Sequence, residues 1–403
     1  MTSNRPLEGL RVIDVGTRIS APFCAGLLGE LGAEVIKVED PRTGDFMRHI
    51  GPFVPSDEGP DYSLFWSVEG RGRQSVTCDL RTEQGQDLFR RLAATADVVC
   101  ENFRPGTMER WNIGPDECRD DLVWVRVSIF GQDGPNAHRP GLDRLGIAYG
   151  GLLHLTGEPD RPPVRPGVTI SDYLTGVFGA MAAIAGLYRR DVDGGRRSGP
   201  GAVIDAPLYG SILRVLEWTI AGHDQLGVVR GRQGNRLDNS APLDNYPTAD
   251  GRFVCIVAGS DANFGRLCAA MDRPDLAQDP QWSTLAQRAA KADEINGIVA
   301  DWTTSLTAAE VEAACIASDV PVGLAYTAAD IAADPHMSFR QDLVAIDDPV
   351  LGPVMQQAPF PRYQGEERPT PAGAPRLGEH NEDVWGELVG GEVLEQLRRD
   401  RII

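Results

Sequence analysis

The N-terminal part of the chain alternates short apolar runs with one segment of small residues. The run LRVIDVG, residues 10–16, is typical of a buried strand, and AEVIKVE, residues 33–39, is typical of a second one. Between them APFCAGLLGELG, residues 21–32, has helical character and stops at Gly32. Strand, helix and strand in this order predict two parallel strands joined by a right-handed crossover.

The same alternation continues through the first half of the chain. We predict a helix at residues 84–96, followed by strands at 97–102 and 122–131. This order is typical of an α/β fold with a doubly wound, Rossmann-like parallel sheet. Ligands of such a sheet bind at the carboxyl ends of the strands.

The second half predicts a further strand and a smaller α/β region. Residues 189–201 are rich in turn residues and lead into a strand at 202–207 and a helix at 209–222. Residues 227–251 are polar and lack strong periodicity, so we interpret them as a linker and a functional loop. The elements predicted after this loop are a strand at 253–259, helices near 263–271, 293–305 and 308–318, and a C-terminal helix at 381–390.

The composition is that of an ordinary soluble protein with room for two domains: 403 residues, 42% of them hydrophobic. A formal net charge of −19, with no run of Lys or Arg, argues against a nucleic-acid or anionic-membrane partner. Seven scattered cysteines without a CxxC pair favour a reducing compartment over disulfides or zinc. We find neither a leader sequence nor an apolar stretch of the roughly 20 residues that span a bilayer, so we expect a cytoplasmic protein.

The sequence lacks the common cofactor, nucleotide, metal and serine-hydrolase motifs. We therefore expect any catalysis to depend on carboxylate side chains and backbone dipoles. The first strand is followed by GTRISAP, which has one glycine where a dinucleotide site needs three. Six single histidines form no cluster, and no Walker, HExxH or GxSxG motif is present. Asp172 stands between the β-branched residues 168–170 and a small-residue helix at 176–188, so we expect it at a strand-to-helix junction. An Asp in that place is either a helix cap or a catalyst.

Seven segments in the same order resemble the class III coenzyme A transferases, the group of formyl-CoA, carnitine CoA and bile-acid CoA transferases. These segments span nearly the whole chain. They are residues 6–45, 74–85, 96–114, 130–143, 155–176, 318–336 and 376–385.

The resemblance implies that Asp172 is a nucleophile, because it matches the Asp of the family motif GVxIGDxxxG. Ser171 stands where the family has Gly, which places a Cβ where the backbone approaches the substrate. The implied chemistry passes through a mixed anhydride and an aspartyl-CoA thioester. We expect N–H groups at the start of the following helix to stabilise the oxyanion.

The resemblance also implies a set of coenzyme A contacts. Asp143 matches an acidic family residue near the nucleophile, and Gly141 and Leu142 are expected to line the thioester end. Asp40 occupies a basic family position, which suggests that Arg42 has taken over part of a phosphate contact. The other implied contacts are Ile19, Ser20, Cys78, Asp79, Leu80, Arg81, Asn102, Phe103, Arg104 and Arg110.

Two alternative functions stay open from the sequence. Racemases of 2-methylacyl-CoA thioesters share the fold but use a His in a GHD motif, where this chain has Leu142. The second alternative is a catalytically weak CoA-binding protein, because residues 235–243 contain LDNSAP in place of the glycine-rich flap of formyl-CoA transferases.

The implied architecture is a large Rossmann-like CoA-binding domain of residues 1–200 plus 335–403, with a smaller α/β domain at 228–325. Residues 201–227 are expected to form a linker helix region and 326–334 a return linker. The family resemblance further implies an interlocked homodimer. The implied partners are an acyl-CoA donor and a carboxylic acid acceptor, with coenzyme A as substrate and product and with no permanently bound cofactor or metal.

Overall fold

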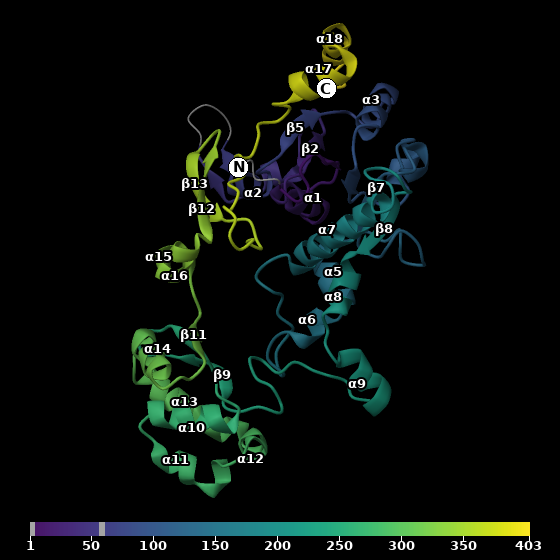
Figure 1. Ribbon diagram of the computed structural model, residues 1–403. Helices are drawn as coiled ribbons and strands as arrows, with labels where there is room; N and C mark the ends of the chain where they lie inside the picture. The colour runs from purple at the N-terminus through teal and green to yellow at the C-terminus, as the bar shows by residue number, and fades with distance from the viewer. Residues whose placement is uncertain (1–4, 56–60) are drawn as a thin grey trace. The chain divides into compact units, whose positions relative to one another are not determined.

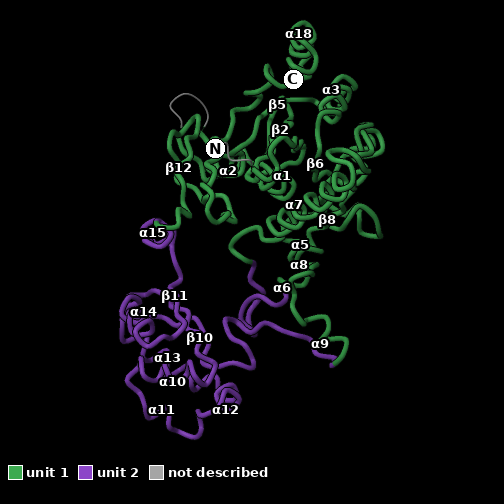
Figure 2. The backbone as a smooth tube through the Cα atoms, in the orientation of Figure 1, with its two compact units in different colours: residues 1–153, 166–225, 339–403 green, residues 154–165, 226–338 purple. Residues whose placement is uncertain are grey.

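A computed structural model describes residues 5–55 and 61–403 and divides the chain into two compact units. The large unit comprises Met1–Leu153, Pro166–Gln225 and Phe339–Ile403, and the small unit comprises His154–Arg165 and Leu226–Ser338 (Figure 2). Both ends of the chain therefore build the large unit.

A six-stranded parallel sheet forms the centre of the large unit (Figure 1). Its spatial order is β5-β2-β1-β6-β7-β8, and all five pairings are parallel. In chain order this is 3-2-1-4-5-6, the doubly wound order whose switch point lies between β1 and β6. The predicted α/β fold is confirmed. The strands are β1 (Arg11–Asp14), β2 (Glu34–Glu39), β5 (Gln74–Thr77), β6 (Val98–Glu101), β7 (Val123–Ser128) and β8 (Ala202–Pro207).

Alternate residues of each strand face the two sides of this sheet. Val12 and Val35 pack with helices α1 (Ser20–Glu30) and α7 (Ile170–Asp191) in one buried cluster. Their neighbours Ile13 and Ile36 pack on the other side with α3 (Glu83–Ala93), α17 (Asn381–Val389) and α18 (Gly391–Arg399). The nearly continuous apolar runs of the sequence follow from this burial on both faces.

The C-terminal segment covers the free edge of β5. The N–H of His380 donates to the carbonyl of Ser75 at 2.9 Å, and the side-chain oxygen of Asn381 accepts the N–H of Thr77 at 2.8 Å. The indole of Trp385 donates to the Thr77 carbonyl at 3.0 Å. These contacts satisfy backbone groups that an edge strand otherwise leaves open.

The small unit has a three-stranded antiparallel sheet in the order β11-β10-β9, with a buried core of its own. Its strands are β9 (Leu243–Pro247), β10 (Phe253–Val257) and β11 (Val322–Leu324), and its helices are α10 (Asp261–Ala270), α11 (Pro274–Gln278), η3 (Pro280–Trp282), α12 (Leu285–Ala290), α13 (Ala292–Thr304), α14 (Ala308–Ala317) and α15 (Ala328–Ala333). Helices α10, α13 and α14 lie close to the predicted ranges, whereas the other helices of this unit were not predicted.

Several short elements complete the described chain. The remaining ones are η1 (Phe46–His49), β3 (Phe53–Val54), β4 (Tyr62–Ser63), α2 (Leu64–Glu69), α4 (Thr107–Arg110), η2 (Pro115–Glu117), α5 (Asp143–Tyr149), α6 (Leu152–Leu155), α8 (Leu208–Arg214), α9 (Thr219–Leu226), α16 (Pro335–Arg340), β12 (Leu343–Asp348) and β13 (Gly352–Gln357).

Three sequence expectations are corrected by these elements. No strand precedes Asp172, because residues 161–169 are irregular and the helix begins at Ile170. Strand β9 lies inside the segment interpreted as linker and loop, and the hairpin of β12 and β13 was not predicted. The third correction concerns α7, which at 22 residues is long and apolar enough to cross a membrane, although no such stretch was expected. It packs against α1, β7 and β8, as a core helix does.

Candidate active site

The switch point of the sheet is closed by contacts between the loops that follow β1 and β6. Asn102, directly after β6, accepts the N–H of Thr17 at 2.9 Å and donates to the carbonyl of Thr17 at 2.6 Å. Its amide also donates to the hydroxyl of Ser20 at 3.3 Å. Two predicted site residues, Ser20 and Asn102, are thus held together at the carboxyl edge where a ligand of this fold binds.

Asp172 lies in the first turn of α7, with its carboxyl group turned to the loop after β1. The helix N-cap is Thr169, so Asp172 is not the cap. Ser20 lies close enough to this carboxyl group to favour its ionised form. Burial, and then the nearby charge of Asp143, raise the pKa of Asp172 to about 7, while Ser20 and Arg18 act in the opposite direction. The pKa of this carboxyl group is therefore well above that of a surface Asp.

Asp143 is the first residue of α5 and is buried beside the start of α7. Its Oδ1 accepts the hydroxyl of Ser171 at 2.7 Å, the N–H of Ser171 at 3.0 Å and the N–H of Asp172 at 3.4 Å. Its Oδ2 is buried without a hydrogen bond from any described residue. The N–H groups of Ser171 and Asp172, expected to stabilise an oxyanion, are therefore already occupied by Asp143.

Close contact between α7 and the start of α1 depends on Gly176. A Cβ at this position would lie 3.0 Å from the carbonyl oxygen of Ser20 and 2.9 Å from the ring of Phe23. The ring of Phe23 packs edge-on against Tyr173 at 4.8 Å. The absence of a side chain at Gly176 lets α7 approach closely enough for Asp172 to meet Ser20.

A cluster of opposite charges follows β2 and β5. Arg42 and Arg81 share the carboxylate of Asp40, at 3.0 and 2.6 Å, and Arg81 also pairs with Asp79 at 2.7 Å. Burial raises the pKa of Asp79, and Arg42 opposes this effect. The structure thus brings together Asp40, Arg42, Asp79 and Arg81, which were predicted to lie near a phosphate.

Three predicted contact residues have buried side chains. Cys78 and Leu80 belong to the apolar cluster of the sheet, and burial raises the pKa of the Cys78 thiol. Ile19 packs in a separate small cluster with Met47 and Trp66. The Cys78 and Asp79 N–H groups already donate to the carbonyls of Glu39 and Ile402, so these side chains and amides serve the fold.

The residues after β6 and β7 are more open. Phe103 packs edge-on against Trp111 at 5.2 Å, Arg104 is exposed, and Arg110 is exposed with a hydrogen bond to Thr107 at 2.9 Å. Gly141 is half-buried, and Leu142 is 57% exposed directly before buried Asp143. The exposed side chains of Arg104 and Arg110 are therefore accessible to an anion from solvent.

The sequence analysis missed Arg18 and the turn that supports it. Arg18 has a left-handed backbone with φ of 69°, and its guanidinium lies 3.6 Å from the ring centre of Phe46. The carboxylate of Asp45 accepts the N–H of Arg18 at 3.1 Å and that of Met47 at 2.8 Å. Asp45, directly before the short helical turn η1, was the available signal, because an Asp in that position caps such turns.

Residues 7–381 match the family model described as CoA-transferase family III. The chain belongs to CoA-transferase family III. The succinyl-CoA–D-citramalate CoA-transferase of Chloroflexus aurantiacus is 40% identical over 408 residues, which cover 99% of this chain and 98% of that protein. The beta subunit of the succinyl-CoA–L-malate CoA-transferase of the same organism is 40% identical over 413 residues, covering 100% and 99% of the two chains.

Solved structures agree with this membership. A CaiB/BaiF family protein from Brucella suis matches this family III chain with a TM-score of 0.85 at 32% identity, covering 96% of this chain and 100% of that one. The predicted family and the predicted transferase activity are confirmed, and the protein is a CoA-transferase. Among residues 5–55 and 61–403 of this transferase, no group of three or more His, Cys, Asp or Glu side chains could hold a metal ion.

Proposed function

We propose that this transferase moves coenzyme A from succinyl-CoA to a small dicarboxylic acid, with Asp172 as the nucleophile. The observation that carries the proposal is the half-buried Asp172 carboxyl, whose backbone N–H donates to Asp143 and whose pKa is raised to about 7. The names of the two Chloroflexus transferases support the donor and the acceptor class, since both name succinyl-CoA and both acceptors, citramalate and malate, are dicarboxylic acids.

The proposed reaction begins when an Asp172 carboxylate oxygen attacks the thioester carbonyl. The C–S bond breaks, the CoA thiolate leaves, and a mixed anhydride joins Asp172 to the acyl group. The thiolate then attacks the aspartyl carbonyl, which releases the donor acid and forms an aspartyl-CoA thioester. The acceptor carboxylate reverses both steps and leaves as its CoA thioester, with Asp172 regenerated.

The raised pKa of Asp172 suits this chemistry. An ordinary Asp, with a pKa near 4, is a poor nucleophile against a thiolate leaving group whose conjugate acid has a pKa of about 8.5. A pKa of about 7 brings the two groups much closer, so the uphill first step becomes less unfavourable. Burial without a full counter-ion at Asp172 is the physical cause.

Exposed arginines at the carboxyl edge of the sheet are the proposed phosphate contacts of coenzyme A. Arg42, Arg81, Arg104 and Arg110 all follow strands of the parallel sheet and are exposed, and a guanidinium group can bind phosphate oxygens in pairs. In the structure Arg42 and Arg81 pair with Asp40, so a phosphate would compete with that carboxylate for them. We expect Arg104→Gln and Arg110→Gln to raise the KM for acyl-CoA with little change in kcat. Arg91→Gln, an exposed change on α3, is the control.

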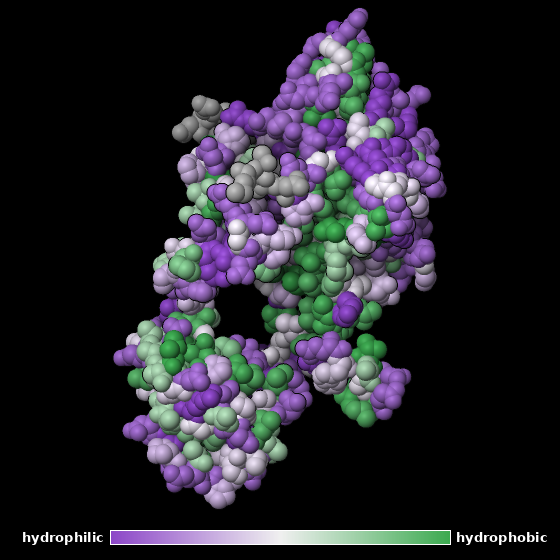
Figure 3. All heavy atoms as spheres, in the orientation of Figure 1, coloured by the Kyte–Doolittle hydropathy of each residue, from purple (hydrophilic) through white to green (hydrophobic). Residues whose placement is uncertain are grey.

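We propose that two copies of this chain interlock as a homodimer. An apolar patch on the large unit supports this, visible over α5, α7 and α8 (Figure 3). Large patches of this kind mark interfaces. Its exposed members are Leu145, Tyr149, Val177, Met181, Ile184, Tyr188 and Leu213.

Light scattering coupled to size-exclusion chromatography tests the dimer. Wild-type protein is expected at twice the chain mass, and Met181→Asp is expected to shift it towards the monomer. Val393→Asp, a matched change at another exposed apolar residue on α18, is expected to leave the dimer intact. A wild-type monomer at micromolar concentration contradicts the proposal.

We further propose that the enzyme acts in the cytoplasm and binds coenzyme A only as substrate and product. The scattered cysteine pattern, typical of a reducing compartment, supports the location. The proposed acyl transfer supports the role of coenzyme A as substrate and product only, because a carboxylate nucleophile needs no bound cofactor for this reaction.

An activity assay tests the proposed function. We would incubate the enzyme with succinyl-CoA and a panel of acids containing D-citramalate, L-malate, glutarate and butyrate. The proposal expects one acceptor thioester for each succinate released. Hydrolysis without an acceptor thioester contradicts the transferase mechanism, and α-deuterium uptake from heavy water without transfer supports the racemase alternative. Binding of succinyl-CoA without any turnover supports the CoA-binding protein.

A further inference from the structure

The guanidinium of Arg18 has no hydrogen bond or ion pair with any described residue, although the side chain is half-buried. Many other arginines of the large unit are paired, for example Arg48 with Glu39 at 2.8 Å and Arg73 with Asp14 at 3.3 Å. A guanidinium has five N–H donors and no acceptor. An arginine left with all of these donors open near the half-buried carboxyl of Asp172, the proposed nucleophile, is therefore a candidate for ligand binding.

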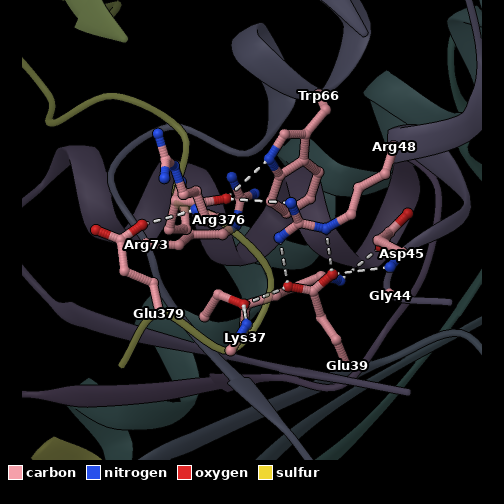
Figure 4. A network of polar contacts seen from close by, with 12 residues as sticks. Lys37, Glu39, Gly44, Asp45, Arg48, Trp66, Arg73, Arg376 and Glu379 are labelled. Atoms are coloured by element: carbon pink, nitrogen blue, oxygen red, sulfur yellow. Dashed lines mark hydrogen bonds and ion pairs between the residues drawn. The ribbon is translucent and has the colours of Figure 1, made fainter. Parts of the chain in front are cut away.

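Figure 4 shows a buried ionic network that contains Lys37, Glu39 and Asp45, and Asp45 of this network fixes the backbone at Arg18. Asp45 accepts the N–H of Arg18 through one carboxylate oxygen, and its other oxygen lies 2.8 Å from the Lys37 ammonium. Lys37 also donates to the carbonyl of Gly16 at 2.6 Å, and Glu39 accepts the N–H of Asp45 at 2.8 Å. These contacts hold the loop after β1 in the strained, left-handed conformation that Arg18 adopts.

Phe46 supports the side chain of Arg18 from one side. The guanidinium carbon lies 3.6 Å from the ring centre, and Phe46 itself is 42% exposed. Stacking on an aromatic face leaves the N–H groups at the edge of the guanidinium open, and this planar edge matches a carboxylate in a two-point contact. The N–H groups along the edge of the Arg18 guanidinium are therefore available to a carboxylate ligand.

Arg18 and Asp172 belong to the same site without forming a pair. Ser20, two residues after Arg18, packs against the first turns of α7, where a Cβ at Gly176 would lie 3.0 Å from its carbonyl oxygen. Ser20 and the Arg18 charge both favour the ionised form of Asp172 and so lower its pKa. No ion pair joins Arg18 and Asp172. A small dicarboxylic acid fits this arrangement, because its two carboxyl groups are separated by a few carbon atoms. One carboxyl group can react at Asp172 while the other reaches Arg18.

We propose that Arg18 binds the second carboxylate of a dicarboxylic acyl group or acid while its first carboxyl group reacts with Asp172. This assignment rests on the proposed function and adds a residue that selects dicarboxylic over monocarboxylic substrates. Both the donor acyl group and the acceptor acid pass through the anhydride on Asp172, so one arginine serves both. Arg18 follows β1, whereas the proposed phosphate contacts follow β2, β5 and β6.

Comparison of succinyl-CoA with butyryl-CoA tests the proposal, because the two acyl chains have equal length and differ in the terminal carboxylate. We expect Arg18→Gln to lower kcat/KM for succinyl-CoA by roughly 10- to 100-fold and to change that for butyryl-CoA less than about twofold. Arg91→Gln is the matched control, and thermal unfolding checks that both variants are folded. Equal losses with both donors indicate a phosphate contact or a structural role and overturn the proposal, as does no loss with either.

A second measurement tests whether Arg18 binds a carboxylate, and it does not depend on catalytic turnover. Phenylglyoxal modifies accessible arginines, and peptide mass spectrometry reports the extent at Arg18 in the wild-type protein with coenzyme A present. Free succinate is expected to protect Arg18, and butyrate at the same concentration is not. Equal labelling with both acids overturns the proposal. A wild-type enzyme that transfers no CoA while succinate still protects Arg18 means that the proposed function fails and the carboxylate site stands.

Discussion

The backbone N–H of Asp172 donates to the carboxylate of Asp143 at 3.4 Å, which places two acidic side chains at the starts of neighbouring helices α7 and α5. Burial and the charge of Asp143 together disfavour the ionised form of Asp172. The N–H groups of Ser171 and Asp172 hold the Asp143 carboxylate in place, and Ser20 favours the ionised form of Asp172. The carboxylate of Asp172, the proposed nucleophile, is thus made more basic by its surroundings.

The rate of the first half-reaction is expected to follow the ionisation of Asp172. Only the carboxylate attacks the thioester, so the rate of CoA adduct formation should rise with pH along a single step centred near pH 7. Rapid-quench mass spectrometry at saturating succinyl-CoA from pH 5 to 9 measures this profile. In Asp143→Asn the like charge is gone, and the midpoint should move to lower pH. A wild-type midpoint near pH 4 contradicts the account.

The free energy of unfolding of the wild-type protein should depend on the same ionisation. It should fall with rising pH, whereas the rate of adduct formation rises. The pKa of Asp172 is raised in the folded state above the ordinary 3.8, so the folded protein binds this proton more tightly than the unfolded chain does. The contribution of Asp172 to the free energy of unfolding therefore falls as the pH rises from about 4 to about 7. Asp172→Asn, which cannot ionise, should be more stable than wild type at pH 8 by on the order of 3 kcal/mol.

Calorimetry of both proteins between pH 4 and pH 8 checks this prediction. The difference between Asp172→Asn and wild type should shrink steadily as the pH approaches 4. A variant that is less stable than wild type at pH 8 would show that the Asp172 carboxylate is stabilised, not strained, in the fold.

The fold and the carboxyl-edge loops could be read from the sequence because apolar runs of parallel strands are buried on both faces. Strand β9 escaped notice because its sequence, LDNYP, has Asp, Asn and Pro, which are rare in strands, and it lies at a sheet edge. The β-branched residues before Asp172 suggested a strand, but local preference is weak and tertiary contacts place Ile170 in a helix.

The candidate site was less accessible to sequence reasoning. The resemblance supplied Asp172 and Asp143, yet the bond from Ser171 to Asp143 joins residues 28 positions apart, so it emerges only in the folded chain. Arg18 is not part of a recognised motif. Its guanidinium has no hydrogen bond with any described residue because the acidic residues nearby pair with other cations, and only the folded structure shows those pairings. Cys78 and Leu80 sit in the apolar core, which their motif alone does not disclose.

The hydroxyl of Ser171 is expected to stabilise the site through its 2.7 Å bond to Asp143. Ser171→Ala removes this donor from a buried carboxylate and should lower the free energy of unfolding by about 1–3 kcal/mol, with a slower first half-reaction. Urea unfolding measures the change. Ser305→Ala, at an exposed hydroxyl after α13, is the control. If the two variants are equally stable, the Ser171 bond has no energetic role.

Arg288 is expected to hold the small unit together. Its fully buried guanidinium donates to the carbonyls of Ala241, Trp282 and Gly259 at 3.1, 2.7 and 2.7 Å. Arg288→Met leaves these buried acceptors without a donor, so unfolding should become easier by roughly 3 kcal/mol or more. Thermal unfolding compares it with Arg266→Met, an exposed change on α10. Equal melting temperatures for the two variants contradict this role.

Covalent capture at Asp172 is the most direct test of the account. Intact-protein mass spectrometry after brief incubation with succinyl-CoA should detect a CoA-sized adduct on the wild-type chain, and peptide mapping should place it on Asp172. Asp172→Asn should show no adduct under the same conditions while keeping its fold by circular dichroism. An adduct of the same size on Asp172→Asn, or none on a wild-type enzyme that transfers CoA, would contradict the central claim that Asp172 carries the coenzyme.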